Sequence, residues 1–86
     1  MRILVVEDDF DISNMLKIYF SGQGYDVQVA ARGSEALEMC RQQSPNLIIL
    51  GIMLPDMDCY EIMRRIRAGE NHRQLPILAR SALLLA

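Results

Sequence analysis

The fold is decided near the start of the chain, where residues 3–9 read ILVVEDD. The first four side chains are apolar without alternation, which indicates a strand covered on both faces, as in the parallel sheets of α/β proteins. Three carboxylates, Glu7, Asp8 and Asp9, follow this strand directly. Because the functional sites of such proteins lie in loops at the carboxyl ends of parallel strands, we expect these carboxylates to belong to any functional site.

Strand and helix patterns alternate along the rest of the chain. Further strands are predicted at 25–29, whose alternation suits a sheet edge, at the continuously apolar 47–50, and at 76–79, which a proline can begin. Helices are predicted at about 11–21, from Gly33, and from Cys59 until Gly69. Apolar residues repeat at helical spacing in the first helix (Ile12, Met15, Leu16 and Tyr19) and in the third (Cys59, Ile62, Met63 and Ile66). The second helix has a predicted inner stripe of Ala36, Leu37 and Cys40. This βαβαβαβ order predicts an α/β fold with a doubly wound parallel sheet.

Length and composition exclude several classes of protein. The 86 residues suit one domain, 1–86, and 51% hydrophobic residues can form a core. A net charge of −2 argues against direct nucleic-acid binding, and no apolar run approaches the length of a membrane span. Two separated cysteines and one histidine form neither a disulfide framework nor a zinc motif, so we expect reduced thiols and a cytoplasmic protein.

The acidic run admits two interpretations. Asp9 or Asp11 can cap the following helix while the other acids face water. Alternatively, Glu7 and Asp8, with a backbone carbonyl and waters, can hold Mg²⁺, which prefers oxygen ligands. Capping explains one acid well and three poorly, so both interpretations stay open.

Basic residues gather in the last third of the chain. Arg64, Arg65 and Arg67 suit either a solvated helix face or an anion site, and His72 lies in a polar connection where a histidine is usually exposed. Residues 22–24 read GQG, but they follow a helix rather than a strand, so they do not support a dinucleotide site.

Three segments resemble the receiver domains of bacterial two-component response regulators, which are phospho-acceptor modules. They are residues 3–9, residues 47–61, which read LIILGIMLPDMDCYE, and residues 76–82, which read PILARSA. The resemblance implies a flavodoxin-like receiver fold with strand order 2-1-3-4, lacking the family's last strand and helix. In that family an acidic pair holds Mg²⁺, an aspartate ending the third strand takes phosphate from a histidine kinase, and a hydroxyl ends the fourth strand.

Carried onto this chain, the resemblance places Mg²⁺ on Glu7, Asp8 and the Met53 backbone carbonyl, and the switch hydroxyl on Ser81. The acceptor position is occupied by Gly51, which has no side chain, so no acyl phosphate can form there. The family's lysine after a fifth strand is also missing.

The resulting prediction is a degenerate receiver that is not an enzyme and binds Mg²⁺ weakly if at all. It would contact a histidine kinase or another signalling protein, and it would self-associate through strand 76–79 or the sheet face beside the first helix. Two alternatives remain: a phosphorylatable receiver that uses another acid, such as Asp56 or Asp58, and a small Mg²⁺-dependent phosphatase using Glu7, Asp8 and Asp56. Cys59 stands where the family usually has glycine, and it would be strained if that position required a positive φ.

Overall fold

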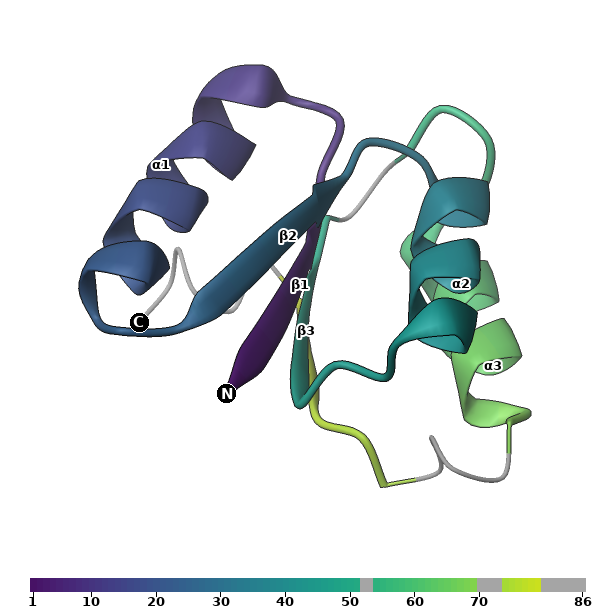
Figure 1. Ribbon diagram of the computed structural model, residues 1–86. Helices are drawn as coiled ribbons and strands as arrows, with labels where there is room; N and C mark the ends of the chain where they lie inside the picture. Colours follow the sequence, from purple (N-terminus) through teal and green to yellow (C-terminus); the bar gives the residue numbers. More distant parts are fainter. Residues whose placement is uncertain (52–53, 70–73, 80–86) are drawn as a thin grey trace.

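The computed structural model describes residues 1–51, 54–69 and 74–79 (Figure 1). Met53, His72 and Ser81 lie outside these described residues. The elements are, in order, β1 (Arg2–Val6), α1 (Phe10–Gly22), β2 (Asp26–Ala30), α2 (Gly33–Gln42), β3 (Leu47–Leu50), α3 (Cys59–Arg67) and β4 (Ile77–Ala79). Each predicted strand and helix is confirmed, although β2 and β4 each begin one residue later than predicted, and β4 thus follows Pro76.

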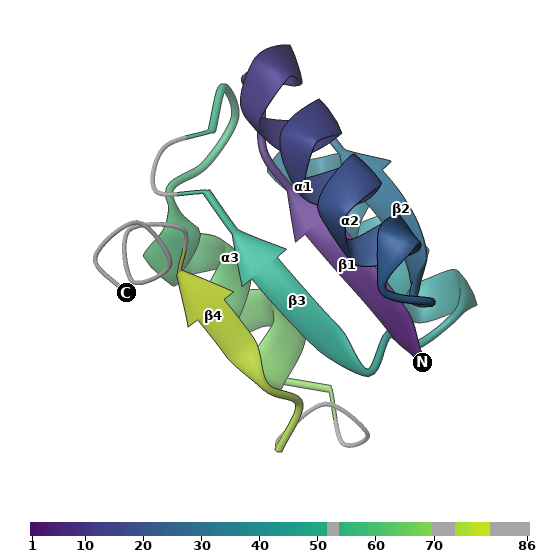
Figure 2. The ribbon, with the colours of Figure 1, turned by 90° about the vertical axis from the view of Figure 1, so that its left-hand side faces the viewer.

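The four strands form one parallel sheet in the order β2-β1-β3-β4, as predicted. Helix α1 covers one face of the sheet, whereas α2 and α3 lie side by side on the other (Figures 1 and 2). Strand β1 is central, and the side chains of residues 3–6 are at most 2% exposed. This strand is therefore buried on both faces, as its unbroken apolar sequence predicts.

Successive side chains of β1 divide between two apolar clusters. Leu4 and Val6 pack in the cluster beneath α2 and α3, whereas Ile3 and Val5 pack in the cluster beneath α1. The larger cluster contains most of the predicted inner stripe of α2 and of the apolar repeat of α3, because Ala36, Cys40, Cys59, Ile62 and Ile66 are all buried there. The predicted inner stripe of α2 is thus confirmed.

In α1, two residues of the apolar repeat do not face the sheet. Met15 and Tyr19 are 56% and 60% exposed, whereas Ser13 is buried and Leu16 and Phe20 pack on the sheet. The helix carries apolar side chains around much of its circumference, so helical spacing alone did not show which apolar row contacts the strands. In the structure, residues 13, 16 and 20 face the sheet, and residues 15 and 19 lie on the surface.

The segments that the structure describes contain no helix with both the length and the apolar composition needed to cross a bilayer.

Gly33, the first residue of α2, is held in a tight contact with the loop before α3. A Cβ atom at this position would lie 2.5 Å from Met57 Cγ and 3.0 Å from Ile62 Cδ1. Such separations are shorter than van der Waals contact, so only glycine fits here without movement of the neighbouring side chains.

We predict that Gly33→Ala lowers the free energy of unfolding by about 1–3 kcal/mol, because Met57 must leave its present position. The matched control is Gly22→Ala at the end of α1, where an added Cβ meets nothing within 4 Å. This control should leave stability unchanged or raise it by up to about 1 kcal/mol. Urea denaturation of both variants measures the difference, and equal stabilities would contradict the proposed contact.

Candidate functional site

The candidate site lies at the carboxyl ends of the two central strands. The Gly51 amide donates a hydrogen bond to the Val6 carbonyl at 2.7 Å, and the Glu7 amide donates to the Ala30 carbonyl at 2.9 Å. These bonds continue the sheet by one residue beyond β1 and β3. Glu7 and Gly51 are therefore neighbours across the sheet, as expected where parallel strands end together.

The Glu7 side chain turns inward and lies over Gly51. The residue is only 3% exposed, and its Oε2 accepts a hydrogen bond from the Asp9 amide at 3.1 Å. A Cβ atom on Gly51 would be 3.0 Å from Glu7 Oε1 and 3.1 Å from the Val6 carbonyl oxygen. The interpretation in which Glu7 faces water is therefore wrong: its carboxylate occupies the space where a side chain at position 51 would begin.

The other two acids of the run have separate roles. Asp9 caps α1, because its Oδ1 accepts a hydrogen bond from the Ile12 amide at 3.2 Å. Asp8 is exposed at the rim of the site. The choice between Asp9 and Asp11 as the cap is thus settled in favour of Asp9, and one acid of the run remains free to face a solvent cation.

Asp56 joins the loop after β3 to the start of α2. Its two carboxylate oxygens accept hydrogen bonds from the Gly33 and Ser34 amides at 2.8 and 2.9 Å. The residue at the local N-cap position, Arg32, makes no side-chain capping bond, so Asp56 caps α2 from a distance in sequence. No local signal in the sequence could have revealed this contact, because Ser34 and Gly33 lie 22 and 23 residues before Asp56.

The same contact favours the ionised form of Asp56. Hydrogen bonds from the Ser34 and Gly33 amides hold the pKa of the Asp56 carboxyl below its usual value. A carboxyl with a lowered pKa in the folded state stabilises the fold above its unfolded pKa, and this contribution is lost as the pH falls through the folded pKa. Asp56 is therefore an ionised cap at neutral pH.

Asp58 and Cys59 begin α3. Asp58 Oδ1 accepts a hydrogen bond from the Glu61 amide at 2.9 Å, which makes Asp58 the N-cap. Cys59 is buried, and no non-glycine residue in the described ranges has a positive φ. The strain expected if this position required a positive φ is therefore absent, and the cysteine starts the helix in an ordinary backbone conformation.

Among the residues that the structure describes, the donors at this edge do not make a complete magnesium site. Glu7 and Asp8 offer two carboxylates, Gly51 offers none, and the Met53 carbonyl lies outside the described residues. Within residues 1–51, 54–69 and 74–79, no group of three or more acids, histidines and cysteines is arranged to hold a metal ion. The described residues therefore fall short of the donor set that Mg²⁺ favours in proteins.

Two of the three arginines of α3 lie on a solvated face and share an ion pair. Arg64 and Arg65 both contact the Glu61 carboxylate, at 3.6 and 3.3 Å, and both are largely exposed. Arg67 instead donates a hydrogen bond to the Leu75 carbonyl at 2.8 Å, which ties α3 to the segment before β4. These residues lie on the α3 face of the sheet and do not belong to the acidic edge.

Comparison with known proteins assigns the family. The family model described as the response regulator receiver domain matches residues 3–83 of this chain. The transcriptional regulatory protein AfsQ1 of Streptomyces coelicolor is 41% identical over 80 residues, which cover 93% of this chain and 34% of that protein. The regulator RpaA of Synechocystis, a DNA-binding dual master transcriptional regulator, is 38% identical over 82 residues, or 95% of this chain and 34% of that protein. The chain thus spans about a third of the length of these curated relatives.

Solved structures agree with this assignment. A response regulator from Chloroflexus aurantiacus matches with a TM-score of 0.88 at 36% identity, covering 91% of this chain and 64% of that one. The receiver domain of the sensor histidine kinase PA1611 from Pseudomonas aeruginosa matches with a TM-score of 0.86 at 35% identity and the same coverage, and that structure has Mg²⁺ in its active-site cleft. By sequence and by fold, this chain belongs to the response regulator receiver domain family of two-component signalling.

Proposed function

We propose that this chain is a receiver-like interaction module, a single domain over residues 1–86, that binds signalling proteins without accepting phosphate. The observation that carries the proposal is Gly51 at the end of β3, in the position that the family resemblance assigns to the acceptor aspartate. The Glu7 carboxylate lies where a side chain at this position would begin. The site is thus both without a nucleophile and filled by a neighbouring group.

The chemistry of phosphoryl transfer explains why this substitution matters. An acceptor carboxylate must attack phosphorus in line with the leaving group while surrounding charges offset those of the phosphoryl oxygens. Glycine offers only backbone atoms, and the Gly51 amide is already bonded to the Val6 carbonyl. Nothing at position 51 can form an acyl phosphate.

The geometry of the loop acids argues against both alternatives. Both oxygens of Asp56 accept hydrogen bonds from the start of α2, and Asp58 caps α3. An acceptor role would require either acid to abandon its cap. A phosphatase that uses Glu7, Asp8 and Asp56 would in addition need a nucleophile, yet Glu7 is buried and both oxygens of Asp56 are engaged, which leaves only the exposed Asp8.

Magnesium binding is proposed to be weak at most. The family resemblance assigns the metal to Glu7, Asp8 and the Met53 carbonyl. Glu7, however, is buried, and its Oε2 already accepts a hydrogen bond from the Asp9 amide. Mg²⁺ parts with its water reluctantly, and two carboxylates offer less compensation than three. The proposed binding function needs no bound metal ion.

The proposed partners are a histidine kinase or another signalling protein. The α1 surface supports such contacts, because Met15, Ile18 and Tyr19 are 56%, 65% and 60% exposed and form an apolar area on one helix. Direct nucleic-acid binding is not part of the proposal, since the net charge is −2. The two free cysteines, Cys40 and Cys59, suit the proposed cytoplasmic location.

The same α1 surface supports self-association. Exposed Met and Tyr side chains are enriched at protein interfaces, where burial of their apolar area stabilises the complex. Strand β4 offers a second contact, because its three residues are only half-buried and β3 is its one strand partner in the described part of the chain. We therefore propose that two copies pair through α1 or β4.

The first prediction is that acetyl phosphate leaves the intact mass of the protein unchanged. The reason is that Gly51 presents no carboxylate and the loop acids remain engaged as caps. Intact-protein mass spectrometry, with a phosphorylatable receiver domain as positive control, measures the outcome. A stable added phosphoryl group on this chain would overturn the proposed function.

The second prediction concerns Gly51→Asp. In the absence of metal this variant should lose about 1–3 kcal/mol of stability, because the new side chain crowds Glu7 and adds a like charge beside it. Added Mg²⁺ should restore its melting temperature, whereas phosphorylation should recover less. Gly51→Asn is the matched control, since it brings similar crowding without charge and should gain no stability from Mg²⁺. Equal recovery of metal binding and phosphorylation would count against the argument.

The third prediction is that the protein sediments as a dimer or larger species at micromolar concentrations. Met15→Gln combined with Tyr19→Gln should shift it toward the monomer if the α1 surface mediates pairing. Lys17→Gln, also exposed on α1, should leave the sedimentation profile unchanged. A cooperatively folded wild-type monomer would refute self-association.

A further inference from the structure

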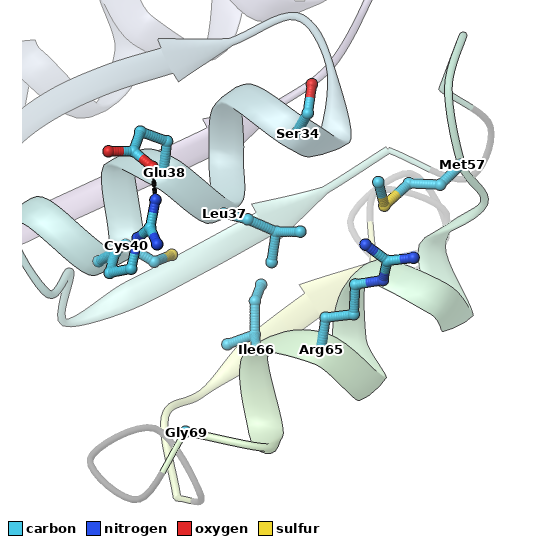
Figure 3. A pocket seen from close by; sticks show the side chains of 9 residues that line it. Ser34, Leu37, Glu38, Cys40, Met57, Arg65, Ile66 and Gly69 are labelled. Carbon is cyan, nitrogen blue, oxygen red and sulfur yellow. Dashed lines mark hydrogen bonds and ion pairs between the residues drawn. The ribbon is translucent and has the colours of Figure 1, made fainter.

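A cavity of about 460 Å³ lies between α2 and α3, apart from the residues of the acidic edge (Figure 3). Its lining includes none of Glu7, Asp8 and Gly51. A volume of several hundred Å³ with a mostly apolar lining is typical of sites for small molecules. Nothing in the proposed receiver function uses this space, so its chemistry can be considered separately.

Apolar side chains form the floor of the cavity. Leu37 of α2 and Ile66 of α3 point toward one another, and Met57 lies at one end (Figure 3). Cys40 also lines the cavity and is 4% exposed. Burial raises the pKa of the Cys40 thiol, so this side chain is neutral and adds to the apolar floor. Such a floor favours the apolar part of a ligand.

The rim of the cavity carries a positive charge. Glu38 and Arg41 form an ion pair on α2 and neutralise one another. On α3, by contrast, the single carboxylate of Glu61 is shared by Arg64 and Arg65. The contact of Arg65 runs through its Nε, and Figure 3 shows its guanidinium directed toward the Met57 end of the cavity. The terminal nitrogens of Arg65 are thus placed to meet an anion, since a guanidinium presents its donors as a fork.

The size of the cavity suits a small molecule. One turn of an α-helix with its side chains occupies a cylinder about 10 Å wide and 5.4 Å long, roughly 420 Å³. The cavity therefore encloses about one turn, and the rest of a docked helix would lie outside it. A compact ligand fits the volume better.

We propose that the cavity between α2 and α3 binds a small carboxylate with an apolar body. The body packs against Leu37 and Ile66, and the carboxylate contacts the Arg65 guanidinium. This site is independent of the proposed receiver function, so either proposal can fail without the other.

Octanoate is a suitable probe of this site. It is titrated into the full chain while the methionine methyl resonances are observed by NMR. Octanoate should shift the Met57 methyl resonance in a saturable manner and leave that of Met15, exposed on α1, in place. Arg65→Gln should weaken octanoate binding by about tenfold, because a charge-assisted contact is lost. The matched control is Arg64→Gln, which alters the neighbouring arginine outside the cavity lining and should change the affinity less than about twofold.

Two further measurements test the apolar body and the sign of the charge. Leu37→Phe fills part of the cavity and should abolish saturable octanoate binding. Thermal unfolding shows whether this variant is folded. If it is not, the comparison of Arg65→Gln with Arg64→Gln tests the proposal alone. Octylammonium, which has the same chain length and the opposite charge, should bind less tightly than octanoate. Equal octanoate affinity in the two arginine variants, or equal affinity of the two probes, would overturn the proposal. So would a Met57 shift on simple dilution of the protein, which would place a second copy in the cavity instead.

Discussion

Burial of β1 on both faces is the constraint on which the rest of the structure depends. Its side chains alternate between two apolar clusters, so each face of the sheet must be covered by helices. Each parallel neighbour of β1 must also be reached by a crossover, and these crossovers supply the helices. The same arrangement brings the ends of β1 and β3 together at one edge, and this places Glu7 beside Gly51.

The loop after β3 fixes the two helices of the larger cluster through three consecutive residues. Asp56 caps α2, Met57 packs against Gly33, and Asp58 caps α3. The acids of this loop are therefore part of the framework, which supports the proposal that neither of them accepts phosphate. Because these contacts hold α2 and α3 side by side, they also maintain the cavity between the helices.

The proposed loss of the acceptor limits the ways in which this receiver domain could signal. A phosphorylated state shifts a conformational equilibrium only through contacts that the unphosphorylated state lacks. In the proposed function, with Gly51 at the end of β3, binding relies on surfaces that exist already, such as the exposed apolar side chains of α1. Regulation would then come from partner concentration or from a ligand, and the cavity between α2 and α3 is one place where a ligand could act.

The sequence by itself determined the order of elements, the buried strands, the inner stripe of α2 and the apolar repeat of α3. These features follow from local periodicity, because a continuous apolar run or a helical repeat is readable within a dozen residues. It also placed Gly51 and the acidic run at strand ends, and the family resemblance supplied the strand order. Only the tertiary structure decided that Glu7 turns inward over Gly51, that Asp56 caps a helix 22 residues earlier, and that Met15 and Tyr19 of α1 stay exposed. Each of these outcomes depends on which surfaces meet in space, and neither local spacing nor propensity carries that information.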